Sequence, residues 1–450
     1  MAKEISKSLD IVRRDGEVLS PCFRSPYYPF AVHSGSGALL FDADGNTYID
    51  FSASAGVLNT GMCHPEVVEA VCAQAREMIG YTIGYMYEES AVELAEMLCR
   101  IVPGDFAKSV AYGLSGSDAM DGAIKFARKY TGRSHVLSFL TAYHGTTYGA
   151  ISASAISLNM HRGIGPLLPD LHYFPYPECP RCPWEQSPEL CALECLEELQ
   201  RALRLHLPPE EVAAVLFEPI AGDAGLVVPP IRYVQALKEL CQTHGILFVS
   251  DEVQQGMGRT GTWTALEHFG VQADIVALGK ALASGLPLSA LVMRKEIGDS
   301  LEHPGHCFTL AGTPVCCRAA LATIRIIEEE RLLERSRQTG LWIQNRLGEM
   351  KRDFPELGET RGLGLSIGQD FLHPGTDIPD RNGCAKICYR CWERGLILTF
   401  LGENTFRIQP PLVLSEEQAQ SGLDILADSI RDYRAGRIGD EVLEFAKGWS

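Results

Sequence analysis

The sequence has no long hydrophobic run and no apolar segment near its N-terminus. A helix that crosses a membrane needs about 18 or more consecutive apolar residues, and no stretch reaches that length. The first residues, MAKEISKSLD, also lack the apolar centre of a signal peptide. These absences predict a protein without membrane contact, and we expect it in the cytoplasm.

Positive charge is scarce as well. The 450 residues include 40 Lys and Arg against 57 Asp and Glu, which gives a net charge of −17. Binding to nucleic acid draws much of its energy from clustered cations, so this balance excludes a nucleic-acid partner. With 46% hydrophobic and 22% charged residues and no internal repeat, the composition is that of an ordinary globular protein.

Cysteine, in contrast, is abundant, with 15 residues scattered along the chain. An odd number spread through predicted helices and strands indicates reduced thiols rather than disulfides. Four of them lie in a proline-rich insert at residues 175–188 and the helical pattern at 190–203: Cys179, Cys182, Cys191 and Cys195. The first pair has the spacing of a zinc knuckle, whereas the second pair fits buried thiols one helical turn apart. We predict no metal here, with a metal knuckle as the alternative.

Helical and strand patterns alternate from about residue 65 onward, which indicates a largely parallel sheet. The predicted strands of this sheet are residues 109–112, 135–139, 212–217, 247–249, 275–278 and 288–293. Residues 38–41 and 47–51 flank an Asp-Gly turn and predict a hairpin. After the sheet, one long helical pattern covers residues 319–350.

This order of elements predicts the α/β fold class, with a mostly parallel central sheet in a large domain. A small α+β domain built from both chain ends is the simplest arrangement for the rest. We expect residues 1–64 to form the N-terminal segment of the small domain, residues 65–319 the large domain, and residues 320–450 the C-terminal part of the small domain.

Lys280 ends an apolar run and is followed by small residues, which is an unusual place for a lysine. Twenty-nine residues earlier, another apolar run ends in Asp251 and Glu252, a separation that matches one strand, helix, strand unit. Both charges are therefore expected at the carboxyl edge of one parallel sheet, where ligands bind. A lysine paired with an acid there is what a pyridoxal 5'-phosphate enzyme needs, because the lysine forms a Schiff base and the acid keeps the pyridine nitrogen protonated.

Three further segments follow predicted strands and reach the same edge. Gly116 and Ser117 begin a helix whose free N-H groups can bind phosphate, although a plain helix cap is the alternative. Tyr143 can stack on a pyridine ring or simply pack in the core. Glu218 and Asp223 lie in a Gly-rich loop, where acidic residues are commonly solvated turn formers.

Seven motifs in chain order resemble the class III aminotransferase family of pyridoxal phosphate enzymes, over about residues 30 to 430. They are Gly116-Ser117, Tyr143-His-Gly145, Glu218-Pro219, Asp251-Glu-Val-Gln254, Gly258-Arg-Thr-Gly261, Gly279-Lys280 and Thr309-Leu-Ala-Gly-Thr-Pro314. The resemblance implies a fold type I homodimer, or a dimer of dimers, with its sites at the subunit interface.

The resemblance also implies roles for individual residues. Lys280 would carry the cofactor, Asp251 would contact the pyridine nitrogen, and Gln254 would lie beside the phenolic oxygen. Tyr143 would stack on the ring, and Thr309 of the partner subunit would join the phosphate site. The full set of implied cofactor-binding residues is Gly116, Ser117, Tyr143, His144, Glu218, Asp251, Val253, Gln254, Lys280 and Thr309.

One departure from the aminotransferase pattern concerns Asp223. Typical members read E-P-x-x-G-E-G-G, and this chain has an aspartate in place of the second glutamate. Together with residues 52–55, 306–312 and 445–449, this is similar to a branch that includes isoleucine 2-epimerase and α-amino-ε-caprolactam racemase. That branch implies Asp223 and Lys280 as the catalytic pair, because racemisation needs acid and base groups on both faces of the substrate's α-carbon.

Arg407 occupies the position where family members clamp the substrate's α-carboxylate, and a guanidinium binds a carboxylate through two hydrogen bonds. A surface salt bridge is the alternative. A lactam has no free carboxylate, so Arg407 favours a free α-amino acid as the substrate.

The leading hypothesis is therefore an isomerase, an amino-acid racemase or epimerase that acts on free, nonpolar or branched amino acids. The first alternative is an aminotransferase with an ω-amino or α-amino donor. The second is a binding protein with the cysteine group as a metal knuckle, which the acidic charge weakens.

Overall fold

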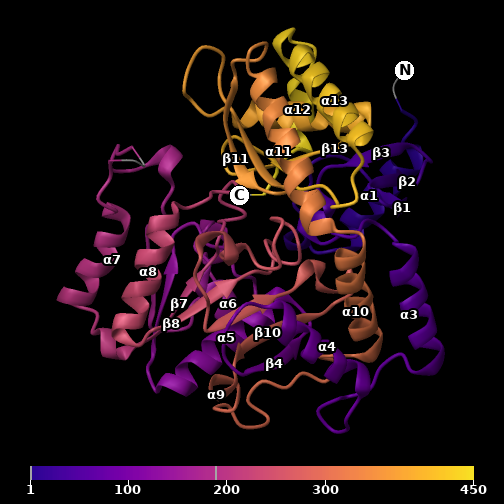
Figure 1. The fold of residues 1–450 in the computed structure, drawn as a ribbon. Helices are drawn as coiled ribbons and strands as arrows, with labels where there is room; N and C mark the ends of the chain where they lie inside the picture. The colour runs from indigo at the N-terminus through magenta and orange to yellow at the C-terminus, as the bar shows by residue number, and fades with distance from the viewer. Residues whose placement is uncertain (1–2, 188–189, 450) are drawn as a thin grey trace. The chain divides into compact units, whose positions relative to one another are not determined.

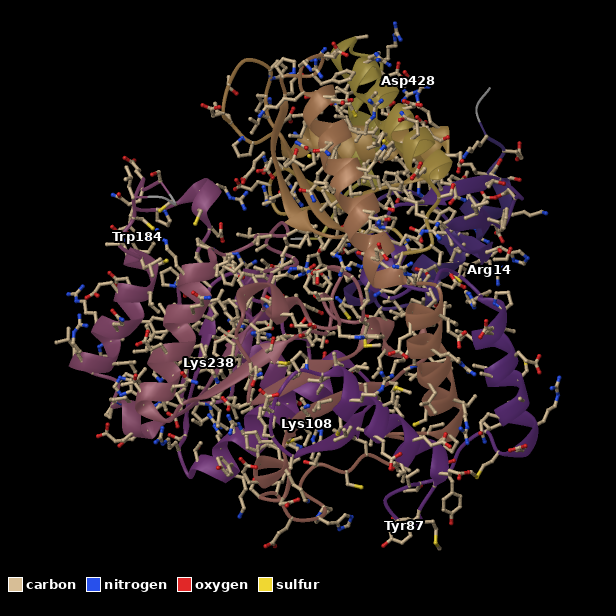
Figure 2. All side chains as sticks on the ribbon, in the orientation of Figure 1. Arg14, Tyr87, Lys108, Trp184, Lys238 and Asp428 are labelled. Carbon is tan, nitrogen blue, oxygen red and sulfur yellow. The ribbon has the colours of Figure 1, made fainter. Side chains whose placement is uncertain are left out.

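The computed structural model describes residues 3–187 and 190–449 (Figure 1), with their side chains in Figure 2. The predicted insert at 175–188 therefore ends in a residue, Pro188, that lies outside the described ranges. The chain divides into two compact units. We call Pro65–Leu333 the central unit, and Met1–His64 with Glu334–Ser450 the terminal unit.

A seven-stranded sheet forms the middle of the central unit, in the order β4-β10-β9-β8-β7-β5-β6. Its strands are β4 (Lys108–Gly113), β5 (His135–Phe139), β6 (Leu171–Phe174), β7 (Val212–Phe217), β8 (Leu247–Asp251), β9 (Ile275–Leu278) and β10 (Ser289–Arg294). Strands β5 to β9 pair in parallel, and β10 runs antiparallel to both of its neighbours. The predicted α/β fold with a mostly parallel sheet is confirmed, although the sequence analysis missed β6.

Helices make up most of the rest of the central unit (Figure 1). They are α3 (Pro65–Glu77), α4 (Glu89–Ile101), α5 (Gly116–Thr131), α6 (Tyr148–Ala153), α7 (Glu194–Leu205), α8 (Ile231–His244), α9 (Lys295–Gly298) and α10 (Pro314–Glu329). Short 3-10 turns join them: η2 (Leu158–Met160), η3 (Cys179–Arg181), η4 (Pro209–Glu211), η5 (Ala265–Phe269) and η6 (Lys280–Ala283).

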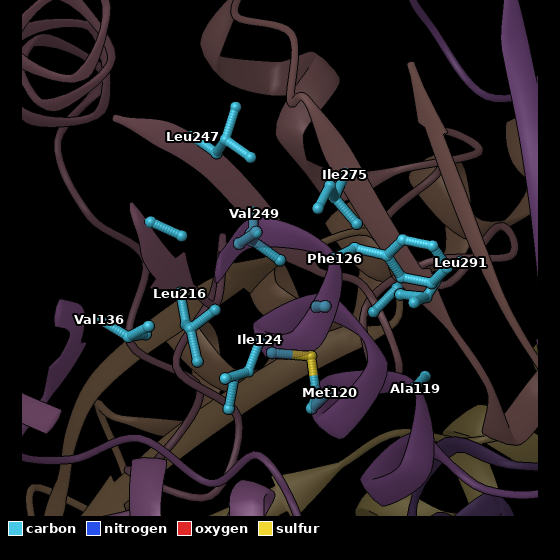
Figure 3. Close-up of a cluster of buried hydrophobic side chains, with 14 of the residues drawn as sticks. Ala119, Met120, Ile124, Phe126, Val136, Leu216, Leu247, Val249, Ile275 and Leu291 are labelled. Carbon is cyan, nitrogen blue, oxygen red and sulfur yellow. The ribbon is translucent and has the colours of Figure 1, made fainter. Parts of the chain in front are cut away.

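Helix α5 packs its apolar face on the sheet and so fixes where its own N-terminus lies (Figure 3). Met120 and Ile124, one helical turn apart, belong to the same buried cluster as Leu216 of β7 and Val249 of β8. Strands β7, β8 and β9 are buried at every position, as the middle of a sheet covered on both faces requires.

The terminal unit contains two small sheets. One has the order β1-β2-β3-β13 and the other the order β11-β12-β15-β14. Their strands are β1 (Val32–Ser36), β2 (Leu39–Asp42), β3 (Thr47–Asp50), β11 (Leu357–Leu363), β12 (Ser366–Phe371), β13 (Leu396–Ile397), β14 (Thr399–Leu401) and β15 (Thr405–Ile408). The predicted hairpin is β2 and β3, and β13 pairs in parallel with β3, so both chain ends share one sheet.

The helices of the terminal unit complete its α+β character. They are α1 (Ser6–Val18), α2 (Ala53–Gly56), α11 (Leu332–Met350), α12 (Arg381–Arg394) and α13 (Glu416–Arg434), with the 3-10 turns η1 (Pro21–Phe23) and η7 (Asp440–Glu444). In the described ranges, no helix is long and apolar enough to cross a membrane.

Two helical expectations were wrong. The pattern at 319–350 is two helices, because Arg331 adopts a left-handed φ of 53° that ends α10 before α11 begins. Helix α10 packs on α3 and α4, and the terminal unit resumes at Glu334, whereas the sequence placed this boundary between residues 319 and 320. Likewise α7 begins at Glu194, after Leu193 with a φ of 65°, so Cys191 precedes the helix.

Candidate active site

A pocket lined mainly by polar side chains lies in the central unit. It collects segments that follow β4, β5, β7, β8 and β9, because the carboxyl ends of parallel strands meet at one edge. Its lining residues are Gly116, Ser117, Tyr143, His144, Gly145, Glu218, Asp223, Asp251, Val253, Gln254, Gln255 and Lys280.

Of the site residues that the sequence predicts, ten are part of the pocket lining, whereas Thr309 and Arg407 are not. Gly145 was visible in the Tyr-His-Gly motif but was given no role. Gln255 was missed entirely. Its side-chain amide donates to Gln254 Oε1 at 3.0 Å, a contact that no spacing in the sequence indicates.

The start of helix α5 forms one end of the pocket. The Ser115 hydroxyl accepts from the Asp118 N-H, and the Asp118 carboxylate accepts from the Ser115 N-H, so the predicted cap is present. The cap leaves the N-H groups of Gly116 and Ser117 at the helix start, where they lack intrahelical partners and suit a phosphate. A Cβ at Gly116 would lie 2.5 Å from Val253 Cγ1, so this close approach requires glycine.

Asp251, at the end of β8, is only 5% exposed. Its Oδ2 atom lies 2.7 Å from His144 Nδ1, and its Oδ1 accepts from the Val253 N-H at 3.1 Å. Nε2 of His144 is buried and has no hydrogen-bond partner among the described residues. Glu252 is outside the pocket lining and accepts from the N-H groups of Ala265 and Leu266, so only one of the two adjacent acids serves the pocket.

Lys280 follows β9 and begins the 3-10 turn η6. Its φ of 41° lies in the left-handed region, which costs energy for a residue with a side chain. Such conformations persist where the surrounding structure enforces them, and they cluster at functional sites. The side chain lines the same pocket as Asp223 and Asp251.

Three carboxyl groups share the pocket, those of Glu218, Asp223 and Asp251. Oε2 of Glu218 accepts from the Tyr143 N-H at 3.3 Å, and its Oε1 accepts from the Gly222 N-H at 3.4 Å. Burial raises the pKa of Glu218 well above its usual range, and the charges of Asp251 and Asp223 add to the effect. Burial also raises the pKa of Tyr143 to about 12.

The two predicted residues outside the pocket differ in their surroundings. Arg407 lies on β15 of the terminal unit and is 6% exposed, and its Nε donates to the Thr399 hydroxyl at 3.2 Å. It is therefore not a surface arginine. Thr309 lies in the central unit and is exposed.

Cys179 and Cys182 of the insert, together with Cys191 and Cys195, line a separate, smaller pocket. Burial raises the pKa of the Cys195 thiol to about 12. Over residues 3–187 and 190–449, no three His, Cys, Asp or Glu side chains are arranged to hold a metal ion.

The donor set of the first pocket fits pyridoxal phosphate. A helix start suits its phosphate, an amine can form the Schiff base, a buried carboxylate can pair with the ring nitrogen, and Tyr143 offers an aromatic face. The tight packing at Gly116 and the unpartnered His144 nitrogen are the features of this structure that a plain polar pocket does not explain.

The chain belongs to the class III aminotransferase family, whose model matches residues 24–430. Members of this family are pyridoxal phosphate enzymes. A pyridoxal-phosphate-bound aminotransferase mutant from Vibrio fluvialis superposes with a TM-score of 0.85 at 26% identity, covering 90% of this chain and 93% of that chain.

Two relatives of known activity match over nearly their whole lengths. A leucine/methionine racemase from Thermococcus litoralis is 44% identical, covering 98% of this chain and 99% of the relative. An isoleucine 2-epimerase from Lentilactobacillus buchneri is 40% identical, covering 97% of each chain.

Glu218→Gln should stabilise the cofactor-free protein at neutral pH. The native state raises the pKa of Glu218 from its usual value of 4.5 and so favours the neutral acid. The stability this acid contributes is fully present below the unfolded pKa and is lost as the pH rises toward the folded pKa. Glutamine stays neutral, so the variant should melt at a higher temperature than wild type at about pH 8, and the gain should vanish near pH 4.5.

Thermal unfolding across this pH range checks the prediction. Glu210→Gln, at an exposed position, is the matched control and should show no gain. Equal melting temperatures for Glu218→Gln and wild type at every pH would mean that Glu218 is not held neutral.

Proposed function

We propose that this chain is a pyridoxal-phosphate-dependent racemase or epimerase that inverts the α-carbon of free, nonpolar or branched amino acids. The observation that carries the proposal is that Asp223 and Lys280, two groups able to exchange protons, line one pocket. The two racemase and epimerase relatives support the same reaction class.

The central unit is the cofactor-binding domain in this proposal, and the terminal unit is the small domain. Gly116 and Ser117 would hold the phosphate, and Asp251, backed by His144, would pair with the ring nitrogen. The remaining cofactor contacts would come from Tyr143, Glu218, Val253 and Gln254. When bound, pyridoxal phosphate draws electrons from the substrate's α-carbon and makes its α-proton acidic.

Lys280 and Asp223 would then move that proton. Inversion requires a base on one face of the α-carbon and an acid on the other. Lys280 Nζ would serve one face, and an Asp223 carboxylate oxygen would serve the opposite one. Asp223 is 7% exposed, so little bulk water can compete with it for the proton.

Arg407 is proposed to bind the substrate's α-carboxylate. Its side chain is buried on β15, and a guanidinium can bind a carboxylate through two hydrogen bonds. This role favours a free α-amino acid over a lactam.

An aminotransferase is the second candidate, favoured by the family as a whole. It differs from a racemase in where the proton is returned, and Lys280 alone suffices for it. A metal-knuckle binding protein has the weakest support, because the cysteine group is separate from the pocket that the family motifs build.

We also propose a homodimer, or a dimer of dimers, that works in the cytoplasm. Large apolar side chains are exposed on the central unit at Tyr85, Met86 and Tyr87, and Figure 2 shows Tyr87 projecting from it. The segment before them lies against the one that carries Thr309, since a Cβ at Gly84 would be 2.9 Å from Cys307 Sγ. Exposed apolar patches mark interfaces, which supports the proposal that Thr309 reaches a partner's phosphate site.

Lys280→Ala should abolish the visible absorption that pyridoxal phosphate acquires when it is bound through a lysine. The other lining residues remain, so the cofactor can still bind noncovalently. The absorption spectrum of purified protein measures this. Lys295→Ala, which removes an exposed lysine paired with Asp299, should keep the band. If the band survives in Lys280→Ala, the lysine is wrongly assigned.

Asp223→Asn should keep the visible cofactor absorption but slow inversion by about 10² to 10⁴, the usual contribution of a general acid or base. The assay incubates one enantiomer in heavy water without keto acid and follows optical rotation and α-deuterium. Asp377→Asn, at an exposed site, is the control. Wild-type-like inversion in Asp223→Asn would remove this residue from the mechanism.

The same assay on wild type separates the two candidate functions. Loss of optical rotation with deuterium at the α-carbon supports the racemase. If the wild type is inert until a keto acid is added and a keto product then accumulates, the aminotransferase is correct.

Thr309→Ala should weaken cofactor binding by about tenfold or more, the loss of one hydrogen bond to a charged group. Titration of cofactor-free protein followed by visible absorption measures the affinity. Thr376→Ala, an exposed threonine of the terminal unit, is the control.

Mixing subunits tests whether Thr309 acts across the interface. A dimer of one Lys280→Ala subunit and one Thr309→Ala subunit should regain one tight site, since only that site combines Lys280 with the partner's threonine. Failure to regain it, or a monomer in sedimentation, contradicts the proposed interface.

A further inference from the structure

The insert that carries the cysteines also contacts the loop that presents Asp223. We call residues 218–225 the Asp223 loop. Tyr176, two residues after β6, donates from its hydroxyl to the carbonyl of Glu218 at 2.8 Å. Its ring is 4% exposed and stacks on Phe217 with centroids 5.6 Å apart, so the hydroxyl is held rigidly at the first residue of the loop.

A second contact reaches the other end of the loop. Arg181 lies in η3, between Cys179 and Cys182, and its Nη2 donates to the carbonyl of Ala224 at 3.2 Å. Its Nε lies 3.6 Å from a carboxylate oxygen of Glu178, which helps to orient the guanidinium. Figure 2 shows Trp184 of the same insert above α7 in the view.

The residues that follow the Asp223 loop close it. The N-H of Leu226 donates to the carbonyl of Gly222 at 3.0 Å, and Ala221 forms a bridge with Val227. A Cβ at Gly222 would lie 2.2 Å from Gln254 Oε1, so the loop also packs closely against the pocket wall. Asp223 lies in this turn, between the insert contacts at Glu218 and Ala224.

We infer that Tyr176 and Arg181 are positioning residues for Asp223. They are outside the pocket lining and orient Asp223 by holding the backbone of its loop at Glu218 and at Ala224. This inference rests on the proposed function. Misplacing a reacting group by about 1 Å can cost about 10²-fold in rate. Both insert contacts are made to the segment that follows β7 and carries Asp223, whereas Lys280 follows β9. We therefore expect the insert to act mainly on Asp223.

Arg181→Ala tests the inference, because it removes the contact at Ala224 and leaves every pocket residue in place. Inversion should slow by about tenfold or more, with the substrate KM and the visible cofactor absorption unchanged. Arg181→Lys, which keeps one cationic donor, should recover part of the rate. Arg204→Ala, an exposed arginine of α7 paired with Glu197, is the matched control and should behave as wild type.

Tyr176→Phe removes one hydroxyl and keeps the stacked ring, so this substitution should disturb folding least. We expect a smaller loss of inversion rate, again with unchanged KM. Tyr173→Phe is its control, because that hydroxyl also donates to a carbonyl, that of Ser152, outside the Asp223 loop.

Exchange of the α-hydrogen in heavy water separates positioning from general weakening. Each enantiomer presents its α-hydrogen to only one of the two groups. In Arg181→Ala, exchange should fall for the enantiomer that faces Asp223 and persist for the one that faces Lys280. A merely structural insert would lower both rates by the same factor.

Equal losses for both enantiomers, or wild-type inversion in Arg181→Ala, would overturn the inference while the proposed function stands. A wild-type protein that does not invert its substrate would overturn the proposed function and this inference together.

Discussion

The convergence of parallel strands at one edge of the sheet is the constraint on which the rest of the site depends. Strands β7, β8 and β9 are buried on both faces, so a shift of any one of them would open the core. The residues that follow them, Glu218, Asp251 and Lys280, are therefore held in fixed relation although they are far apart in the sequence. Packing of α5 on the same sheet brings its N-terminus to this edge.

Electrostatics then differentiates the groups that the sheet brings together. Three carboxyls in one buried pocket repel one another, and burial with two acidic neighbours raises the pKa of Glu218. Asp251 has His144 Nδ1 beside it at 2.7 Å. Asp223 lies in a loop that a hydrogen bond from the Leu226 N-H to the Gly222 carbonyl closes. One pocket thus brings three carboxyl groups together in three different surroundings.

Two contacts from outside the pocket lining reach the Asp223 loop. Tyr176 and Arg181 donate to the backbone carbonyls of Glu218 and Ala224, and these two bonds do not depend on the side chains of the loop. In the proposed mechanism, these contacts set the position of Asp223, one of the two groups that move the α-proton.

The sequence by itself determined at which strand ends the reactive side chains lie. Apolar runs that end in a charge, at Asp251 and Lys280, predicted the shared edge because parallel strands separated by one helix must end together. It did not determine which of Asp251 and Glu252 faces the pocket, since adjacent residues of a strand point to opposite sides. Only the tertiary structure turned Glu252 toward the N-H groups of Ala265 and Leu266.

Other structural features could not be predicted from any short stretch of the sequence. The break at Arg331 and the late start of α7 after Leu193 need left-handed backbone at residues other than glycine, which tertiary packing imposes and the sequence does not indicate. The same holds for the pairing of Arg181 with Ala224 across 43 residues. The sequence by itself determined which chemical groups are present and on which strands. The packed structure alone decided which of them meet, because those contacts join segments that no spacing rule connects.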